Sequence, residues 1–391
     1  MPLSGLTRSP RHALAVTLLL FVITVTVTSV KLAETPYSWI FISLLLTCLL
    51  AATTCRHAIP MALWLNSGAV MAILLVVESY WTITNGTANT DVTIQYSHDY
   101  VTEHDVLGYA PVKDNIVTAT KFYQDKLVYK VQYGIDKQGL RITSPSEPGA
   151  SNCILFFGGS FTYGEGVNDN ESLPYRVGVH SSGQYRIYNF AFHGYGPHQM
   201  LAALEQGLVD DSIQCKPKHI IYQGMVAHIM RSAGLTTWDV HGPRYRLNEA
   251  HKIEYTGHFD DTQIYHLTRL LRLDASQIYT RIFGTQRPIR HQDVELYVDI
   301  IARAKELFTS RYPGSIFHIL LWGDTKNNNI FSQLLTLIRE QEMNVYPRNE
   351  IMPLYEQNAY KYELSEHDHH PSALAHDLVA QYITTRLLGH M

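Results

Sequence analysis

The chain has 391 residues, enough for two or three structural units with a substantial core. Its formal net charge is −4 at pH 7, so no basic field marks it as a nucleic-acid-binding protein. Hydrophobic residues make up 46% of the sequence, but they are unevenly spread, because three long apolar runs fall at the amino-terminal end.

These three runs predict a membrane anchor over residues 1–80, with transmembrane helices at about 13–30, 36–55 and 58–77. None of the runs contains Asp, Glu, Lys or Arg, and each approaches the ~20 residues that a helix needs to cross a bilayer. A cleaved signal peptide is an alternative for the first run. No clear small-residue cleavage site follows it, so we interpret it as an anchor.

The charges that flank the runs predict their orientation. Arg8 and Arg11 precede the first run, Arg56 separates the second from the third, and Lys31 lies between the first and the second, beside Glu34. The positive-inside bias places the amino terminus in the cytoplasm. After three crossings, the rest of the chain is expected on the extracytoplasmic side, periplasmic or extracellular.

Two short regions follow the anchor. Residues 81–104 are polar and aperiodic, and we expect them to form a linker. Residues 105–150 are expected to form a small β element, because polar and apolar residues alternate over 127–135, the pattern of a half-buried strand. A turn at 136–139 and a short strand at 140–143 complete the expected hairpin, which we expect to pack against the main domain.

From residue 151 onward, expected strands alternate with expected helices. This alternation predicts an α/β domain over 151–391, with a mostly parallel sheet covered by helices on both faces. Residues 230–290 are long for a connection and are interpreted as an insertion. The expected strands are 153–157, 186–190, 219–223, 316–322 and 344–346, and the expected helices are 173–181, 198–208, 291–308, 331–341 and 373–388.

The cysteines of this domain allow two interpretations. Cys153 and Cys215 could form a disulfide if the domain lies outside the cytoplasm. Cys153 begins an expected core strand, however, so buried free thiols are favoured. No Cys/His spacing matches a zinc site.

A serine directly follows the first expected strand of the sheet. Ser160 comes after Gly158 and Gly159, which permit a tight turn, and Gly164 and Gly166 follow in the next loop. Open α/β folds bind their ligands at the carboxyl edge of the sheet, where this hydroxyl is expected to lie.

Two further expected strands are followed by groups that could contribute to a site at the same carboxyl edge of the sheet. The second strand runs into Gly194, whose uncovered amide is suited to stabilise an oxyanion. The third is followed by polar residues, Gln223 and His228, which could face the site or cap the strand end.

The loop before the last helix contains Glu366, His367, Asp368, His369 and His370. A histidine here could act as general base to Ser160, with a carboxylate orienting its ring. Three histidines in four residues also suggest metal binding. Because neighbouring residues cannot easily all ligate one ion, no metal site is predicted.

Together these stretches resemble the SGNH/GDSL hydrolase superfamily. The family's first block is Gly-Asp-Ser followed by Thr and Gly-x-Gly, and here Gly159 replaces the aspartate before Ser160. Its second block is an Asn-led strand ending in an oxyanion glycine, which matches Asn189 to Gly194. Its last block places Asp and His, usually followed by Pro, before the final helix. Here His370 precedes Pro371, and Asp368 stands near it.

The sequence departs from the family pattern in two places. The usual last-block spacing is Asp-x-x-His, whereas Asp368 is two residues before His370, an arrangement similar to the alginate O-acetyltransferase-like branch. Glu366 with His369 restores the usual spacing and is an alternative acid–base pair. In the third block, Val226 stands where an oxyanion asparagine is expected, so that donor is either missing or supplied elsewhere, with Gln223 and His228 as the candidates.

The resemblance covers about residues 150–391 and implies a flavodoxin-like, three-layer α/β/α domain. It implies a serine esterase that acts on O-acyl or O-acetyl groups of carbohydrate or lipid, with Ser160, Asp368 and His370 as the catalytic residues. The amides of Ser160 and Gly194 would bind the oxyanion, and no cofactor would be needed. A polysaccharide O-acetyltransferase and a catalytically inactive glycan-binding or scaffold protein are the alternatives.

Overall fold

The computed structural model describes residues 36–55, 57–85, 91–250, 252–285, 287–323 and 329–389. These residues fall into two compact units. The first contains the described residues up to 85, with α2 (Pro36–Thr54) and α3 (Ala58–Asn85), and the segment Gln263–Pro288. The second contains the described residues of 91–262 and 289–389. The first predicted transmembrane helix, at 13–30, lies outside the described residues.

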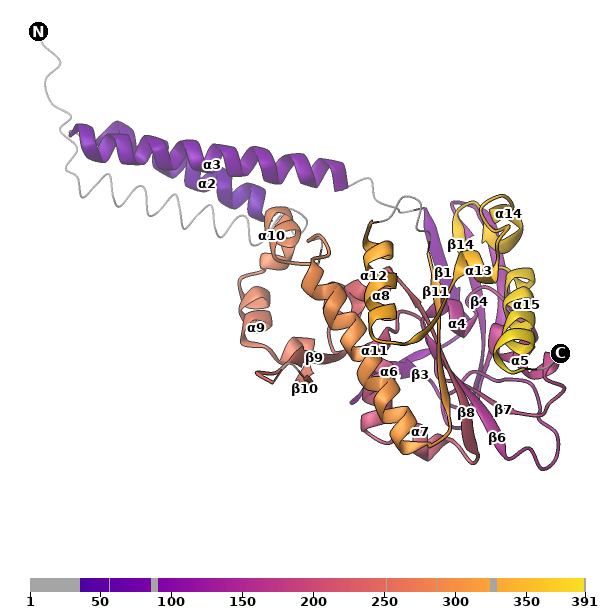
Figure 1. The fold of residues 1–391 in the computed structure, drawn as a ribbon. Helices are drawn as coiled ribbons and strands as arrows, with labels where there is room; N and C mark the ends of the chain where they lie inside the picture. The colour runs from indigo at the N-terminus through magenta and orange to yellow at the C-terminus, as the bar shows by residue number, and fades with distance from the viewer. Residues whose placement is uncertain are drawn as a thin grey trace, which may run out of the picture. The chain divides into compact units, whose positions relative to one another are not determined.

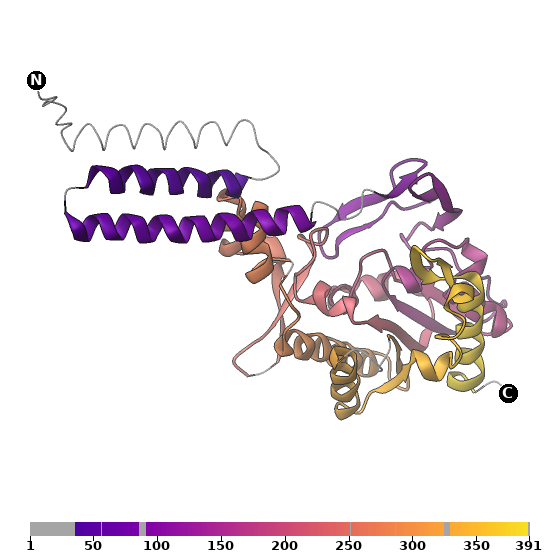
Figure 2. The same ribbon diagram turned by 90° about the horizontal axis from the view of Figure 1, so that it is seen from above.

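The first unit is built on a helical hairpin. Helices α2 and α3 lie side by side and run in opposite directions (Figure 2). Tyr37–Thr54 and Ala58–Thr84 are both long and apolar enough to cross a membrane. Helix α3 continues to Asn85, eight residues beyond the predicted end at 77, because residues 78–85 contain neither glycine nor proline.

Part of the expected 230–290 insertion belongs to this first unit. It forms α9 (Gln263–Leu270), η3 (Leu273–Ala275) and α10 (Gln277–Ile282). The buried carboxylate of Glu78 on α3 accepts hydrogen bonds from Ser276 Oγ and the backbone amides of Gln277 and Ile278, at 2.8–3.1 Å. A helix amino terminus presents unpaired N–H groups and a positive dipole, so this carboxylate fastens α10 to α3.

The second unit contains the predicted parallel sheet, which is confirmed (Figure 1). Its five strands lie in the order β12-β11-β8-β6-β7, and every neighbouring pair is parallel. Numbered along the chain, this is the order 2-1-3-4-5 of flavodoxin-like doubly wound folds. The strands are β6 (Asn152–Gly158), β7 (Arg186–Asn189), β8 (Lys216–Met225), β11 (Ile316–Trp322) and β12 (Asn344–Pro347).

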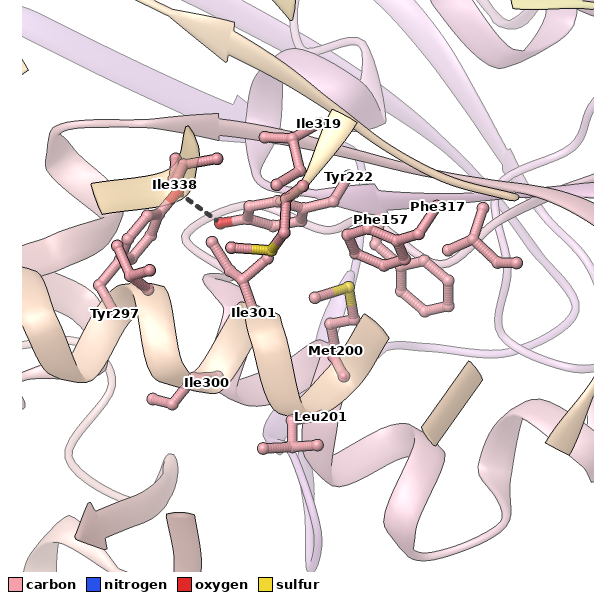
Figure 3. Close-up of a cluster of buried hydrophobic side chains, with 14 of the residues drawn as sticks. Phe157, Met200, Leu201, Tyr222, Tyr297, Ile300, Ile301, Phe317, Ile319 and Ile338 are labelled. Atoms are coloured by element: carbon pink, nitrogen blue, oxygen red, sulfur yellow. Dashed lines mark hydrogen bonds between the residues drawn. The ribbon is translucent and has the colours of Figure 1, made fainter. Parts of the chain in front are cut away.

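Helices cover both faces of the sheet because the buried strands are apolar on both sides. Leu155 and Phe157 of β6 face one helical layer, and Ile154 and Phe156 face the other, as the two-residue period of a strand requires. The first layer contains α6 (Pro197–Glu205), α11 (His291–Arg311) and α12 (Asn329–Glu340), and the second contains α5 (Leu173–His180) and α15 (Ala373–Tyr382). Figure 3 shows α11 packed against the sheet, where the hydroxyls of Tyr222 and Tyr297 lie 3.2 Å apart.

The shorter elements connect these layers. The helical turns are α4 (Ser160–Tyr163), η1 (Asp169–Glu171), α7 (Leu208–Ser212), α8 (Ala227–Ser232), η2 (Phe259–Asp261), α13 (Arg348–Ile351), α14 (Ala359–Tyr362) and η4 (Ile383–Leu387). Two antiparallel strand pairs are β9 (Pro243–Leu247) with β10 (Ile253–His258), and β13 (Glu363–Ser365) with β14 (Asp368–Pro371).

The small β element is larger than the expected hairpin. Strand β5 (Lys126–Ile135) spans the predicted alternating stretch, but its partner is β4 (Asn115–Tyr123), which also pairs with β1 (Val92–Tyr96). Residues 81–104, expected as a linker, therefore contain β1 and also β2 (Val101–His104), which pairs with β3 (Gly108–Pro111).

Residues 140–143 do not form the expected second strand. Arg141 makes only an isolated bridge to Ile135, and its side chain turns into the main domain. There the buried guanidinium donates to the carbonyls of Tyr163, Gly164 and Val167. This segment therefore fixes the loop after Ser160 instead of extending a sheet.

The favoured interpretation of free thiols is corrected, because Cys153 and Cys215 form a disulfide with their Cα atoms 5.9 Å apart. Cys215 immediately precedes β8, which pairs in parallel with β6, where Cys153 is the second residue. Parallel pairing brings the starts of the two strands together, and the sequence separation of the cysteines does not reveal this.

Candidate active site

Ser160 lies where β6 ends and the short helix α4 begins, at the carboxyl edge of the sheet. The turn leaves no room for side chains at either preceding glycine. A Cβ atom on Gly158 would lie 2.9 Å from the Gln223 carbonyl oxygen, and one on Gly159 would lie 2.5 Å from Arg231 Nη1. The glycine pair thus positions Ser160 against its neighbours, and the serine is 8% exposed.

His370 and Asp368 meet Ser160 from strand β14. His370 Nε2 lies 2.8 Å from Ser160 Oγ, and His370 Nδ1 lies 2.5 Å from Asp368 Oδ1. Because side chains alternate along a strand, residues two apart share a face. A spacing of Asp-x-His is therefore what a strand requires, and both side chains point inward.

The alternative pair, Glu366 and His369, is not formed in the structure. His369 lies between Asp368 and His370 on β14, so it points away from Ser160, with 72% of its side chain exposed. Its Nδ1 lies 2.6 Å from Glu363 Oε2, whereas Glu366 pairs with His367. The alternation of the strand separates His369 from the serine.

A second carboxylate, from Glu165, also faces His370. Glu165 Oε2 lies 3.5 Å from His370 Nε2, the nitrogen that contacts Ser160. Lys121 from β4 lies between the two acids, with Nζ 2.8 Å from Asp368 Oδ2 and 3.5 Å from Glu165 Oε1. One lysine thus neutralises charge on both sides of the imidazole.

Glu165 is held in place by further polar contacts. Its Oε2 lies 2.7 Å from His193 Nδ1, and His193 Nε2 lies 2.7 Å from the hydroxyl of Tyr100. Tyr129 donates a hydrogen bond of 3.3 Å to Glu165 Oε1. Both oxygens of this buried carboxylate are therefore engaged.

The environment keeps both acids ionised. Burial alone would raise the pKa of Glu165, but His370, His193 and Lys121 outweigh it and hold that pKa well below its usual range. Burial also opposes ionisation of Asp368, yet its contacts with His370 and Lys121 lower its pKa. Two carboxylates and one ammonium therefore surround the imidazole.

Gly194 lies in the loop after β7, with φ of +74°. A Cβ atom there would lie 2.4 Å from the Tyr109 hydroxyl and 2.6 Å from Trp238 Nε1, so only glycine fits. Tyr109 also donates to the carbonyl of His193, which fixes the peptide just before Gly194. Within the described part of the chain, the amides of Ser160 and Gly194 donate to no protein acceptor.

The two candidates for a third oxyanion donor each make one contact within the protein. Gln223 is buried, and its Oε1 accepts a hydrogen bond of 2.9 Å from Thr162 Oγ1. His228 is fully buried, with Nδ1 2.7 Å from the Tyr222 hydroxyl. Burial and the nearby charge of Arg231 lower the pKa of His228 well below its ordinary value, so this ring is neutral.

Arg231 borders Gly159, the residue before Ser160. Its Nη1 donates a hydrogen bond of 2.7 Å to the carbonyl of Tyr195, next to Gly194. The same nitrogen would lie 2.5 Å from a Cβ atom at position 159, so a larger residue there would displace it. The glycine at 159 thus makes room for a cation that holds the loop of Gly194.

One group of side chains has the spacing of a metal site. The ligand atoms of Glu165, Asp368 and His370 all lie within 4.8 Å of one another. Lys121 contacts both carboxylates, and its ammonium supplies the positive charge that an ion would bring. The lysine thus balances one of the two negative charges.

Lys121, Glu165, His193 and Arg231 were not predicted as site residues. A signal for Lys121 exists in the sequence, because it continues the buried face of β4 after Val117 and Ala119. A lysine at an apolar position of an alternating strand indicates a buried ion pair. The other three depend on which loops meet at the sheet edge, and residue spacing does not show this.

No protein-family model matches the chain, and no curated protein matches it. Among solved structures, it is similar to a carbohydrate esterase with divergent catalytic and non-catalytic binding functions, at 14% identity and a TM-score of 0.36, over 77% of this chain and 87% of that chain. It is also similar to an acetyl xylan esterase from the rumen bacterium Butyrivibrio proteoclasticus, at 11% identity and a TM-score of 0.35, over 76% of this chain and 84% of that chain. At these TM-scores neither likeness indicates the function of this chain.

Proposed function

We propose that this chain is a membrane-anchored serine ester hydrolase of the SGNH/GDSL type. One observation carries the proposal. A serine hydroxyl, both imidazole nitrogens and a buried carboxylate form a continuous chain through Ser160, His370 and Asp368, with contacts of 2.8 and 2.5 Å. This is the geometry that activates a weakly nucleophilic hydroxyl.

The mechanism proceeds in two halves. His370 Nε2 takes the proton from Ser160 Oγ as the oxygen attacks the ester carbonyl, and the imidazolium then gives that proton to the departing alcohol. This leaves an acyl-enzyme. Water repeats the sequence in the second half, with His370 as base, and releases the carboxylic acid.

Two carboxylates stabilise the imidazolium in this scheme. Asp368 holds Nδ1 and so fixes the orientation of the ring. Glu165 lies on the Nε2 side, where it favours the charged form of the ring as Ser160 loses its proton.

The oxyanion of the tetrahedral intermediate would be bound by the amides of Ser160 and Gly194. Arg231 acts on this pair as a positioning residue, because it holds the carbonyl of Tyr195 next to Gly194. Gln223 is the candidate for a third donor, because Thr162 engages only its side-chain oxygen, whereas the donor would be its amide nitrogen. We assign no such role to His228, because its ring is fully buried.

The proposed substrates are O-acyl groups, including O-acetyl groups, of envelope or exported carbohydrate or lipid. This follows from the proposed location of the domain outside the cytoplasm, tethered by α2, α3 and the predicted helix at 13–30. The disulfide between Cys153 and Cys215 supports that location, because such bonds persist in oxidising compartments.

The test uses the full chain in detergent micelles, treated with a fluorophosphonate probe that labels activated serines. The wild type is compared with Ser160→Ala and His370→Ala, and His369→Ala is the matched control because that ring faces solvent. Labelling that is lost in the first two variants and retained in the control is expected. If a folded wild type does not react, the serine mechanism is wrong, and glycan binding would be tested next.

A second assay separates hydrolysis from transfer. A chromogenic acetyl ester is supplied with and without a polysaccharide acceptor, and acetate and acetylated glycan are both measured. Release of acetate to water in equal amount with and without the acceptor is expected for an esterase. Acetylated glycan in excess of free acetate would instead identify an O-acetyltransferase.

A further inference from the structure

The segment Gln263–Pro288 presents large apolar side chains to solvent. On α9, Ile264 is 72% exposed, Leu267 is 53% exposed and Leu270 is 79% exposed. Leu271 and Phe283 are exposed by 52% and 68%. Ile264, Leu267 and Leu271 follow at intervals of three and four residues, so they form one helical face.

Helix α12 shows what such a face normally does in this protein. Its apolar side chains, Phe331, Leu334 and Ile338, are fully buried against the sheet. The apolar face of α9 has the same periodicity but is covered by none of the described residues. Only a partner outside the described residues could therefore bury this face.

The segment is fixed to one end of the α2–α3 hairpin. Glu78 and Trp81, near the end of α3, contact the start of α10 and Arg281, respectively. Tyr37, at the start of α2, donates to the carbonyl of Leu271. Since the hairpin is antiparallel, the start of α2 and the end of α3 lie at the same end, where Trp81 has the position of an interfacial anchor.

The charge of the segment is opposite in sign to that of the whole chain. It contains four arginines, at 269, 272, 281 and 287, and one acidic residue, Asp274, which gives a net charge of +3. The whole chain has a net charge of −4. A short region with an apolar face and an arginine-rich remainder is typical of helices that lie in the interface of an anionic bilayer.

We propose that Gln263–Pro288 is an interfacial membrane-binding segment. Its apolar face, defined as Ile264, Leu267, Leu270 and Leu271, enters the boundary between headgroups and acyl chains, and its arginines contact anionic headgroups. The inference rests on the proposal that α2 and α3 cross the bilayer, and it is independent of the proposed ester chemistry. The segment would then hold this end of the α2–α3 hairpin at a defined depth in the bilayer.

The test places fluorophores on the full chain in vesicles. Cys48 and Cys55, the free cysteines among the described residues, are replaced by alanine, and the disulfide is kept. A single cysteine then carries an environment-sensitive dye at Leu267, at His266 or at Ile73 of α3. The vesicles contain equal parts of phosphatidylcholine and phosphatidylglycerol. They also contain lipids spin-labelled near the acyl boundary and lipids spin-labelled near the chain ends, which quench dyes at the boundary and at the bilayer centre, respectively.

Quenching at 267 is expected to exceed that at 266 about twofold, because the side chain at 266 points about 100° away from that at 267 around the helix axis. The difference is expected to shrink in pure phosphatidylcholine and in the double variant Arg269→Gln, Arg272→Gln. Ester hydrolysis by Leu267→Asp is expected to match the wild type, since this residue lies outside the candidate site.

Three outcomes would overturn the proposal, and they are distinguishable. Quenching at Ile73 with equal, weak quenching at 266 and 267 means that the hairpin is in the bilayer but α9 is not. No quenching at Ile73 means that the anchor itself is wrong. Energy transfer between dyes at 267 on different copies, dependent on protein density, means that the face binds a second copy of the chain.

Discussion

The ammonium of Lys121 lies 2.8 Å from Asp368 Oδ2, so the small β element contributes directly to the candidate site. His370 takes the other oxygen of the same carboxylate, at 2.5 Å. Asp368 is therefore held between a cation from β4 and the imidazole it orients. The small β element was expected to pack against the main domain, and this contact gives it a further role.

Replacing Lys121 with methionine is expected to lower kcat/KM about tenfold or more. The buried carboxylates of Asp368 and Glu165 would lose the cation they share, and the cluster would bind protons more tightly. The acidic limb of the pH–rate profile is therefore expected to move to higher pH. Steady-state hydrolysis of a chromogenic ester across pH measures both effects.

Lys130→Met is the matched control for this prediction. Lys130 is an exposed lysine on the neighbouring strand β5, so its loss removes the same charge without entering the site. Its kinetics are expected to equal those of the wild type. Equal kinetics in Lys121→Met would show that the ion pair is purely structural.

Replacing Glu165 with glutamine is expected to have the opposite effect on pH dependence. The side chain keeps its shape and can still contact His193, but the negative charge 3.5 Å from His370 Nε2 is lost. With less negative charge, the cluster binds protons less readily, so the acidic limb moves to lower pH. The value of kcat is expected to fall about tenfold, because the imidazolium loses one stabilising charge.

Glu103→Gln, an exposed acid on β2, controls for a change in overall charge. The informative comparison is the direction of the two shifts. If Lys121→Met and Glu165→Gln move the limb the same way, electrostatic coupling to the imidazole is not the cause.

Replacing Gly194 with alanine is expected to lower kcat/KM about 100-fold, the scale of losing one oxyanion donor. The added Cβ would overlap Tyr109 and Trp238, so the loop and its amide must move. Gly207→Ala is the matched control, because Gly207 has a similar φ of +76° but no atom within 4 Å of the added Cβ. A loss of activity as large in Gly207→Ala would assign the effect to backbone strain in general.

Periodicity along the sequence predicted the sheet well, because each parallel strand is buried on both faces and reads as a short apolar run. The same reasoning brought Ser160 and Gly194 to one sheet edge, since parallel strands place their carboxyl ends together. Periodicity does not indicate whether His369 or His370 is the histidine that contacts Ser160. That choice depends on β14 being a strand, and a run of Glu, His and Asp has no apolar pattern from which to predict one.

The partners of these residues were beyond prediction for a different reason. Lys121, Glu165 and Arg231 come from three separate elements, and only the packing of those elements brings them to the serine. Residues 230–290 were expected to form a single insertion, because the sequence pattern does not show which elements its two halves pack against. Its second half joins α3 through the carboxylate of Glu78, a contact between residues almost 200 positions apart.

The last prediction concerns stability at acid pH. Burial lowers the pKa of His318 to about 4 and that of His376 to about 3, against the ordinary value of 6.5. Both rings are neutral in the folded state above these values, whereas the unfolded chain binds their protons below about 6.5. The unfolded state therefore binds more protons between pH 6.5 and 4, and the free energy of unfolding falls as the pH falls through this range.

Each of these histidines is expected to contribute at most about 1.4 kcal/mol per pH unit in that range. Thermal denaturation of the full chain in detergent, followed from pH 7 to pH 4, measures the slope. His318→Gln is expected to reduce it, because one buried site no longer titrates, while the amide can still bond to His219, whose Nδ1 lies 3.1 Å from His318 Nε2. His291→Gln, an exposed histidine on α11, is expected to leave the slope unchanged. An equal slope in His318→Gln and the wild type would assign the acid sensitivity to other groups. Asp368 and Glu165 are among them, because their lowered pKa values make the free energy of unfolding fall below about pH 5, where the carboxyl groups of the unfolded chain begin to bind protons.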